Sequence, residues 1–252
     1  MKRIVSLALM LLIAFSLSAC GNSEENVESS ISELSEEYTQ TSTISEPSES
    51  ADAPFGEGTA NQPAKESTNN ILVAYFSRVG NTDFEDGVDV ITSASLNLEG
   101  DTLVGNAEVL ARMAQEETGG DLFLIKTVEK YPSDYDETTD VAAEEQGDDA
   151  RPELASHVEN MDRYDTVILI YPNWWGTLPQ PLFTFLEEYD FSGKTILPLC
   201  THAGSRMGRS EQDIANLCPK ANLMEGLAVS GSSVNEAGAD VAEWITNSGI
   251  LE

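Results

Sequence analysis

The chain has 252 residues and a formal net charge of −31, because 13 lysines and arginines stand against 44 aspartates and glutamates. Beyond residue 70 there remain 33 acidic and 10 basic residues, a net charge of −23. This charge excludes electrostatic binding to nucleic acid or to an anionic membrane surface. Two histidines and no CxxC pair leave no credible zinc or iron–sulfur site, so no metal is expected.

The N-terminus has the pattern of a secretory signal. Lys2 and Arg3 precede an apolar run to about Leu17, and small residues follow before Cys20. This predicts a signal peptide over residues 1–19. The sequence "LSAC" resembles the processing box of bacterial lipoproteins, in which cleavage precedes the cysteine and lipid is attached to its sulfur. We therefore expect lipidation of Cys20 and an extracytoplasmic protein that meets the membrane only through this anchor.

Residues 20–69 are rich in serine, glutamate and threonine and contain few large apolar side chains. Such a segment cannot bury enough surface to offset its chain entropy, so we expect a disordered acidic linker. The folded domain should therefore span residues 70–252.

The domain opens with "NILVAYFS" (70–77), a continuous apolar run typical of a strand covered on both faces. The small and hydroxyl residues that follow, "SRVGNT" (77–82), could cradle a phosphate. A helix usually follows such a turn, but residues 83–104 have no helical period and form an expected insertion. The helix begins near Asn106, where "AEVLARMAQEETGG" has helical spacing and a glycine stop signal.

Further strands are expected at "DLFLIKTV" (121–128), "TVILIYP" (166–172), "KTILPLC" (194–200) and "ANLMEGLAV" (221–229), with helices between and after them. Five strands alternating with helices predict an α/β, doubly wound, five-stranded parallel sheet. In such sheets ligands bind outside the carboxyl ends of the strands.

The loops that leave strands one, three and four suit a mononucleotide with a flat aromatic head. The first offers small and hydroxyl residues, the second two indoles between proline and glycine, and the third a second wall for a ring. The candidate residues in these loops are Ser77, Arg78, Gly80, Asn81 and Thr82; Pro172, Asn173, Trp174, Trp175, Gly176 and Thr177; and Thr201, His202, Ala203, Gly204 and Ser205.

These loops give the chain a resemblance to the flavodoxin family. "YFSRVGNT" is similar to the family's phosphate-loop pattern S/T-x-T-G-x-T, with valine in place of one hydroxyl residue. "YPNWWGTLPQPLFTFLE" and "LCTHAGSRMG" look like the flavin-ring loops of its quinone-reductase-like branch. The resemblance covers about residues 70 to 249 and implies an FMN cofactor, strand order 2-1-3-4-5 and electron transfer. It places the first loop at the FMN phosphate and the other two on either side of the ring.

Two positions for the phosphate remain open. Either Gly80, Asn81 and Thr82 hold it and the insertion loops away, or the repeated glycine–asparagine at residues 105–106 supplies the site together with Ala107. The second is favoured, because the aligned N–H groups of a helix N-terminus suit a dianion. Ser77 could serve in either arrangement.

The insertion contains "DVITSAS", residues 89–95. This resembles the D-x-x-S/T-G-A-S/T motif to which bacterial flavin transferases attach FMN through its phosphate, here at Ser95. Ser93 replaces the glycine of that motif. A solvated loop with free FMN is the alternative, and it is the one we expect.

We expect an FMN-dependent oxidoreductase or electron carrier whose partner is a redox protein or a small-molecule acceptor such as a quinone. His202 is the candidate proton donor, or else a hydrogen-bonding loop residue. The alternative function is a non-redox exported lipoprotein that binds a ligand or a partner. Cys200 ends an apolar run typical of a packed thiol, and an exported location permits a bridge to Cys218.

Overall fold

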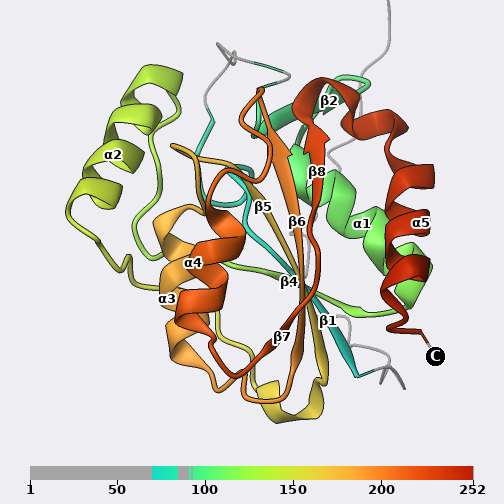
Figure 1. Ribbon diagram of the computed structural model, residues 1–252. Coiled ribbons are helices and arrows are strands. Elements are labelled where there is room, and N and C mark those ends of the chain that lie inside the picture. The colour runs from blue at the N-terminus through green and yellow to red at the C-terminus, as the bar shows by residue number, and fades with distance from the viewer. Residues whose placement is uncertain (1–69, 85–90, 92, 252) are drawn as a thin grey trace, which may run out of the picture. The chain divides into compact units, whose positions relative to one another are not determined.

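The structure is a computed structural model that describes residues 70–84, 91 and 93–251 (Figure 1). The expected signal peptide (1–19), the lipidation site Cys20 and the linker (20–69) lie outside the described residues. So do residues 85–90 and 92 of the insertion, which include Asp89 of the transferase-like motif.

A parallel sheet forms the centre of the domain. Its order is β4-β1-β5-β6-β7, and β8 pairs with the C-terminal half of β6. All seven residues of β5 are buried, as the continuous apolar run predicted. The expected α/β fold and strand order are confirmed. The strands are β1 (Ile71–Tyr75), β4 (Asp121–Leu124), β5 (Thr166–Pro172), β6 (Thr195–His202), β7 (Asn222–Leu223) and β8 (Leu227–Ser230).

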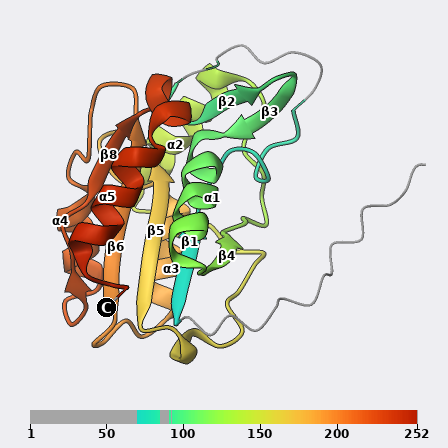
Figure 2. The same ribbon diagram turned by 90° about the vertical axis from the view of Figure 1, so that its right-hand side faces the viewer.

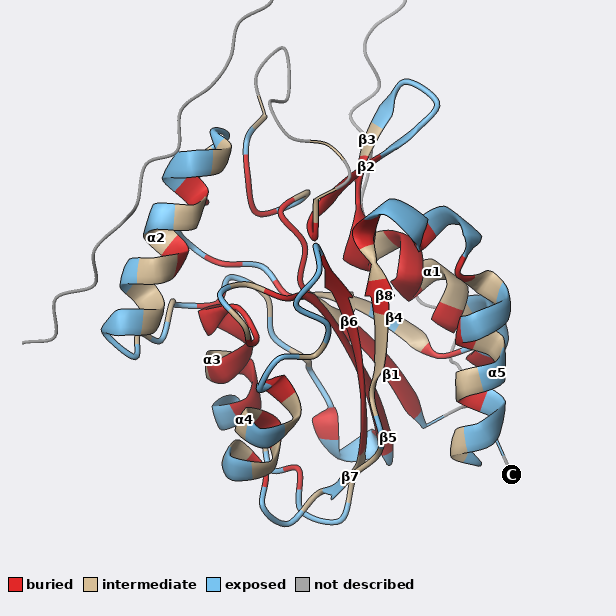
Figure 3. Cartoon of the chain, turned by 45° about the horizontal axis from the view of Figure 1, so that its top comes forward, coloured by how far each residue is buried: buried red, intermediate tan, exposed pale blue. Residues whose placement is uncertain are grey.

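Helices cover both faces of this sheet. Figure 2 shows α1 and α5 side by side on one face, whereas α3 and α4 cover the other. Figure 3 shows that the central strands β1, β5 and β6 are buried almost throughout and that the helices turn their buried stripes inward. The helices are α1 (Asn106–Thr118), α2 (Tyr135–Gly147), α3 (Gln180–Glu188), α4 (Ser210–Leu217) and α5 (Gly238–Ser248), with short 3-10 turns η1 (Met161–Arg163) and η2 (Gly231–Glu236).

The insertion ends in an antiparallel hairpin, β2 (Leu96–Glu99) and β3 (Thr102–Gly105), which sequence analysis did not foresee. The hairpin leads directly into α1, which begins at Asn106 as expected. Gly105 packs closely against Ser77 at this junction, because a Cβ atom there would lie 1.8 Å from Oγ and 3.0 Å from Cβ of that serine. The hairpin therefore approaches the end of β1 so closely that a side chain at residue 105 would require Ser77 to move.

Both cysteines of the domain are buried free thiols in the core beneath α3 and α4. Burial raises the pKa of Cys200 to about 12 and that of Cys218 to about 11. The structure therefore has a packed thiol at Cys200, as expected, and no bridge between the two residues. Among the described residues no helix is long and apolar enough to span a bilayer.

Candidate functional site

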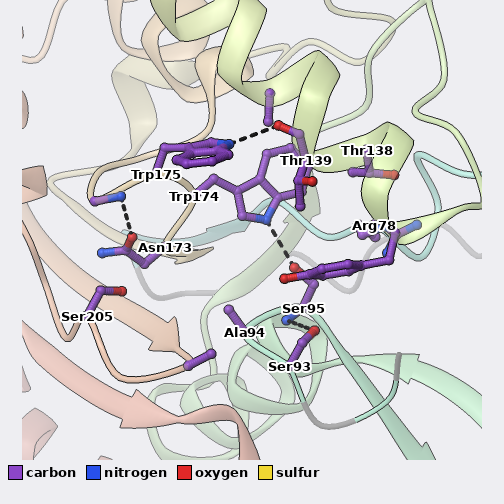
Figure 4. Close-up of a pocket in the computed structure, with 14 residues that line it drawn as sticks. Arg78, Ser93, Ala94, Ser95, Thr138, Thr139, Asn173, Trp174, Trp175 and Ser205 are labelled. Carbon is purple, nitrogen blue, oxygen red and sulfur yellow. Dashed lines mark hydrogen bonds between the residues drawn. The ribbon is translucent and has the colours of Figure 1, made fainter. Parts of the chain in front are cut away.

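A cavity of about 510 Å³ opens at the carboxyl edge of the sheet (Figure 4). Its walls come from the loops after β1, β5 and β6, from residues 93–95 of the insertion and from α2. This is where a doubly wound sheet binds its ligands. The lining residues are Arg78, Ser93, Ala94, Ser95, Tyr135, Thr138, Thr139, Ala142, Asn173, Trp174, Trp175, Gly176, Ala203 and Ser205.

Trp174 forms a fixed, half-buried wall of this cavity. Its ring meets Phe76 edge to face with centroids 5.4 Å apart, and Tyr131 in the same way at 5.1 Å. Its Nε1–H donates to Oγ of Ser95 at 3.0 Å. The Tyr131 hydroxyl in turn donates to Glu145 at 2.8 Å, and burial raises the pKa of that tyrosine well above its usual range. Trp174 is therefore held from three sides.

Trp175 differs sharply from its neighbour, since 58% of its surface is exposed. Its backbone has φ of 52°, and Gly176 follows with φ of 83°, a pair of positive angles typical of a type I′ turn. Asn173 holds this turn by accepting from the Gly176 N–H and donating to the Arg206 carbonyl. The Trp175 indole N–H donates to the carbonyl of Thr139 on α2 at 2.9 Å, so this ring spans the gap between the loop and the helix (Figure 4).

Ser93, Ala94 and Ser95 form a short wall that we call the insertion wall. Three successive carbonyls of this wall accept hydrogen bonds from the protein interior. Ser93 and Ser95 accept from the side chain and the backbone of Asn106, at 2.6 and 3.0 Å, and Ala94 accepts from the hydroxyl of Thr201. The wall is thereby fixed onto the start of α1 and the end of β6.

The turn after β1 contributes one residue, Arg78, to the cavity. The Arg78 guanidinium is buried, and Nη2 donates to the carbonyls of Pro132 and Ser133 at 3.1 and 2.9 Å. The other candidates of this turn, Ser77, Gly80, Asn81 and Thr82, lie outside the lining residues.

Asn81 has a structural task instead. Its amide donates to the carbonyls of Ser77 and Ile125, both at 2.9 Å, and its Oδ1 accepts from the Thr127 N–H. These bonds join the turn to the chain that leaves β4. Thr82 is buried as well, and its hydroxyl has no hydrogen-bond partner among the described residues.

The start of α1 lies beneath the insertion wall. Asn106 and Ala107 are 0% and 1% exposed, and the backbone N–H of Asn106 already donates to Ser95. Neither residue lines the cavity. Both glycine–asparagine turns proposed for phosphate are therefore separated from the cavity, and the insertion wall stands in front of the second.

The loop after β6 supplies Ala203 and Ser205 to the lining, whereas Thr201 is buried and binds Ala94. His202 lies outside the lining, as do Gly204 and, on the β5 loop, Pro172 and Thr177. Nδ1 of His202 accepts from the Gly204 N–H at 2.9 Å. Burial, together with the nearby charge of Arg206, lowers the pKa of His202, so the ring is mainly neutral near pH 7.

Sequence analysis did not assign the α2 wall to the site. Tyr135, Thr138, Thr139 and Ala142 face the cavity, and the helix was expected from its pattern. The i, i+3, i+4, i+7 spacing of these four residues places them on one helical face, which was the available signal. That this face would cover the cavity depends on how α2 packs.

Charge is distributed unevenly between the cavity and the domain. Arg78 is the one lysine or arginine among the fourteen lining residues, and none of the fourteen is an aspartate or glutamate. The domain has a net charge of −23, yet the lining of its cavity carries one positive side chain and otherwise neutral ones, several of which are hydrogen-bond donors. Such a wall suits an anionic ligand. No cluster of three metal-ligating side chains occurs in the described part of the chain.

The chain is similar to several solved structures. A candidate flavoprotein from Bacteroides uniformis ATCC 8492 is 26% identical, with a TM-score of 0.54, and the match covers 71% of this chain and 98% of that one. One from Bacteroides eggerthii DSM 20697 is 27% identical over 68% and 97% of the two chains, with a TM-score of 0.49. There is no match among curated proteins.

The family model described as flavodoxin matches residues 100–248, which is more than half of the chain. The matched range includes the β5 and β6 loops, the β3 strand that leads into α1, and the five α-helices of the described residues. Together with the strand order and the cavity at the carboxyl edge of the sheet, this match shows that the chain belongs to the flavodoxin family.

Proposed function

We propose that this protein binds FMN in the cavity at the carboxyl edge of its sheet and transfers electrons through it. Membership of the flavodoxin family supports FMN as the cofactor. The observation that carries the proposal is the composition of the lining: an aromatic wall, several neutral donors, one arginine and no carboxylate. Bound FMN would supply the capacity to accept and pass on electrons, and the chain would supply binding, orientation and shielding.

The residues present fit this group. A volume of about 510 Å³ lies within the range of small-molecule sites. Trp174 and Trp175 offer aromatic surface for a flat ring, and Asn173 and Ser205 can hydrogen-bond its polar edge. Arg78 and the insertion wall offer charge and hydroxyl groups to the phosphate-bearing tail.

Among the reactions open to a flavodoxin, the transfer of electrons to or from a partner is favoured over the direct reduction of a bound substrate. None of the fourteen lining residues is a histidine, cysteine, aspartate or glutamate, the usual proton donors in catalysis, and His202 lies outside them. The electron partner would be a redox protein or a small acceptor such as a quinone. Reduction of a quinone would then take its protons from water.

We also propose that the protein acts outside the cytoplasmic membrane, tethered by lipid on Cys20. This rests on the signal-like residues 1–19 and the "LSAC" sequence. A linker of 50 residues would reach about 40 Å from the membrane, taking about 5–6 Å times the square root of its length. That reach would let the domain meet partners in solution or on neighbouring proteins.

Purification of the mature chain tests the cofactor assignment directly. The protein should bind FMN with one site per chain, as followed by quenching of flavin fluorescence, and should be reduced and reoxidised reversibly. A folded protein that binds no flavin would contradict the proposal. It would favour the alternative of an exported binding protein without redox chemistry.

A further inference from the structure

We infer that α2 is a lid over the cavity, and that it opens to let FMN enter and leave. The structure has the lid closed, with hydrogen bonds from Trp175 to the Thr139 carbonyl and from Tyr131 to the Glu145 carboxylate. The inference deepens the proposed FMN function and rests on it for the ligand, whereas the opening of α2 can be measured without any flavin.

α2 has little apolar packing to hold it in place. Of the five described α-helices, it alone buries no leucine, isoleucine, valine or phenylalanine side chain, and its two buried residues are Thr138 and Ala142. Figure 1 shows α2 standing apart from the sheet, and its main packing partner among the described elements is α3. Elements with few buried apolar contacts open locally while the rest of the fold stays intact.

The inner face of α2 is turned to the cavity and not to a core. Tyr135, Thr138, Thr139 and Ala142 line the cavity from this side. A surface helix usually gains its stability from an apolar stripe against the core, but this face of α2 lies over a space of about 510 Å³. Movement of α2 would therefore expose little apolar surface, and it would remove one wall of the cavity.

The charges of α2 favour opening as well. Residues 134–149 contain eight carboxylates and no lysine or arginine. Asp134 caps the N-terminus by accepting from a backbone N–H, but Glu144 and Glu145 lie in the last turn, where the helix dipole disfavours negative charge. Asp140 and Glu144, four residues apart, repel each other along the helix. The helix is thus stabilised at its start and destabilised towards its end.

Arginines fix the chain on both sides of α2, so the helix can open between two anchored points. Before the helix, Arg78 donates to the carbonyls of Pro132 and Ser133. After the helix, Arg151 forms a bidentate ion pair with Glu187 of α3, and both N–O distances are 2.8 Å. An opened α2 would therefore stay close enough to the cavity to close again.

The contacts that keep α2 closed come from the aromatic residues of the site. Trp175 donates from its indole to the Thr139 carbonyl at 2.9 Å, and Gln146 donates to the Trp175 carbonyl at 3.4 Å. Tyr131, which packs on the fixed indole wall, donates to Glu145 at 2.8 Å. Phenylalanine at either aromatic position keeps a ring and removes the donor, so each of these two bonds can be tested separately.

Hydrogen exchange of the flavin-free mature chain measures the opening directly. The backbone amides of α2 should exchange at least about tenfold faster than those of α3, which packs on the sheet. Trp175→Phe and Tyr131→Phe should each speed the exchange of α2 by about three- to tenfold, the scale of one hydrogen bond, and should leave α3 unchanged.

Stopped-flow quenching of flavin fluorescence measures passage past the lid. Because a lid controls entry and exit alike, both substitutions should speed FMN association and dissociation by about three- to tenfold and change the dissociation constant by less than about threefold. A residue that only contacts the flavin would speed dissociation alone.

Trp244→Phe is the matched control. The Trp244 indole also donates to a backbone carbonyl, that of Glu225, at 2.9 Å, but this residue lies outside the cavity lining. Its substitution should change neither the exchange of α2 nor the two FMN rates. An equal effect of Trp244→Phe would show that the loss of any such bond loosens the domain, and the lid would be wrong.

The remaining outcomes separate the lid from the FMN function. A wild-type chain that binds no FMN contradicts the proposed function, and the lid then stands or falls on hydrogen exchange. If α2 exchanges as slowly as α3, or if both phenylalanine variants leave its exchange unchanged, the lid is wrong. Faster dissociation with unchanged association also overturns it, because α2 would then be a fixed wall of the cavity.

Discussion

Trp174 and Trp175 are neighbours in the chain, but replacement by alanine should mainly lower stability at the first position and mainly lower FMN affinity at the second. Trp174→Ala removes two edge-to-face pairs, with Phe76 and Tyr131, and one hydrogen bond to Ser95. Each aromatic pair contributes about 0.5–1.5 kcal/mol beyond burial, and the hydrogen bond about 1 kcal/mol. We therefore expect the free energy of unfolding to fall by about 2–4 kcal/mol.

Trp175→Ala should barely change stability. The ring is 58% exposed and makes one hydrogen bond, to the Thr139 carbonyl, so the expected loss is under about 1 kcal/mol. FMN affinity should nevertheless fall by roughly 1–3 kcal/mol, because the cavity lining loses a large aromatic surface. Trp175→Gly is a useful companion, since glycine also suits the positive φ of 52°.

Urea unfolding of the flavin-free chain and fluorescence titration with FMN measure the two quantities separately. The assignment predicts that stability falls mainly in Trp174→Ala and that Trp175→Ala loses affinity while it keeps its stability. Equal destabilisation by both substitutions would refute the distinction between a packed and an exposed indole. Unchanged affinity in Trp175→Ala would remove this ring from the flavin site.

Four further predictions concern the insertion, the anchor and the histidine. FMN should be released completely by acid or urea, because Ser95 is a buried residue, 7% exposed, and its hydroxyl already accepts from Trp174; an intact mass raised by one FMN less a water, and abolished by Ser95→Ala, would instead show a phosphoester. Cys20→Ser should move the protein from the membrane fraction to the soluble fraction of exported protein, and an unchanged distribution would argue against a lipid anchor. Gly105→Ala should lower the free energy of unfolding by about 1–3 kcal/mol, as overpacking does, and Ser77→Gly should recover part of this loss if the 1.8 Å approach is its cause. The pKa of His202 is lower in the folded chain than in the unfolded one, so the neutral ring contributes stability above the unfolded pKa of about 6.5, and this stability is lost as the pH falls. Urea unfolding between about pH 7.5 and 5.5 should therefore show a smaller fall in the free energy of unfolding for His202→Asn than for the wild type.

The sequence alone determined the architecture, because the relevant signals are local. The apolar run at 166–172 requires a strand that is covered on both faces, and the spacing after Asn106 requires a helix. Once strands and helices alternate, the handedness of the connections leaves few topologies, and the carboxyl edge is the expected site. Trp174, Trp175 and Ser205 could be assigned to the cavity on these grounds.

Only the tertiary structure decided which polar residues face the cavity. Asn81 has the residue type of a phosphate ligand, but its hydrogen bonds to Ile125 and Thr127 bridge more than 40 positions in sequence, and no local pattern encodes them. No local pattern indicated that Ser93 and Ala94 would line the cavity. They do so because Asn106 and Thr201, which belong to distant elements, donate hydrogen bonds to their carbonyls. Local periodicity fixes which elements form, whereas the direction of each polar group depends on partners that only the packed chain brings together.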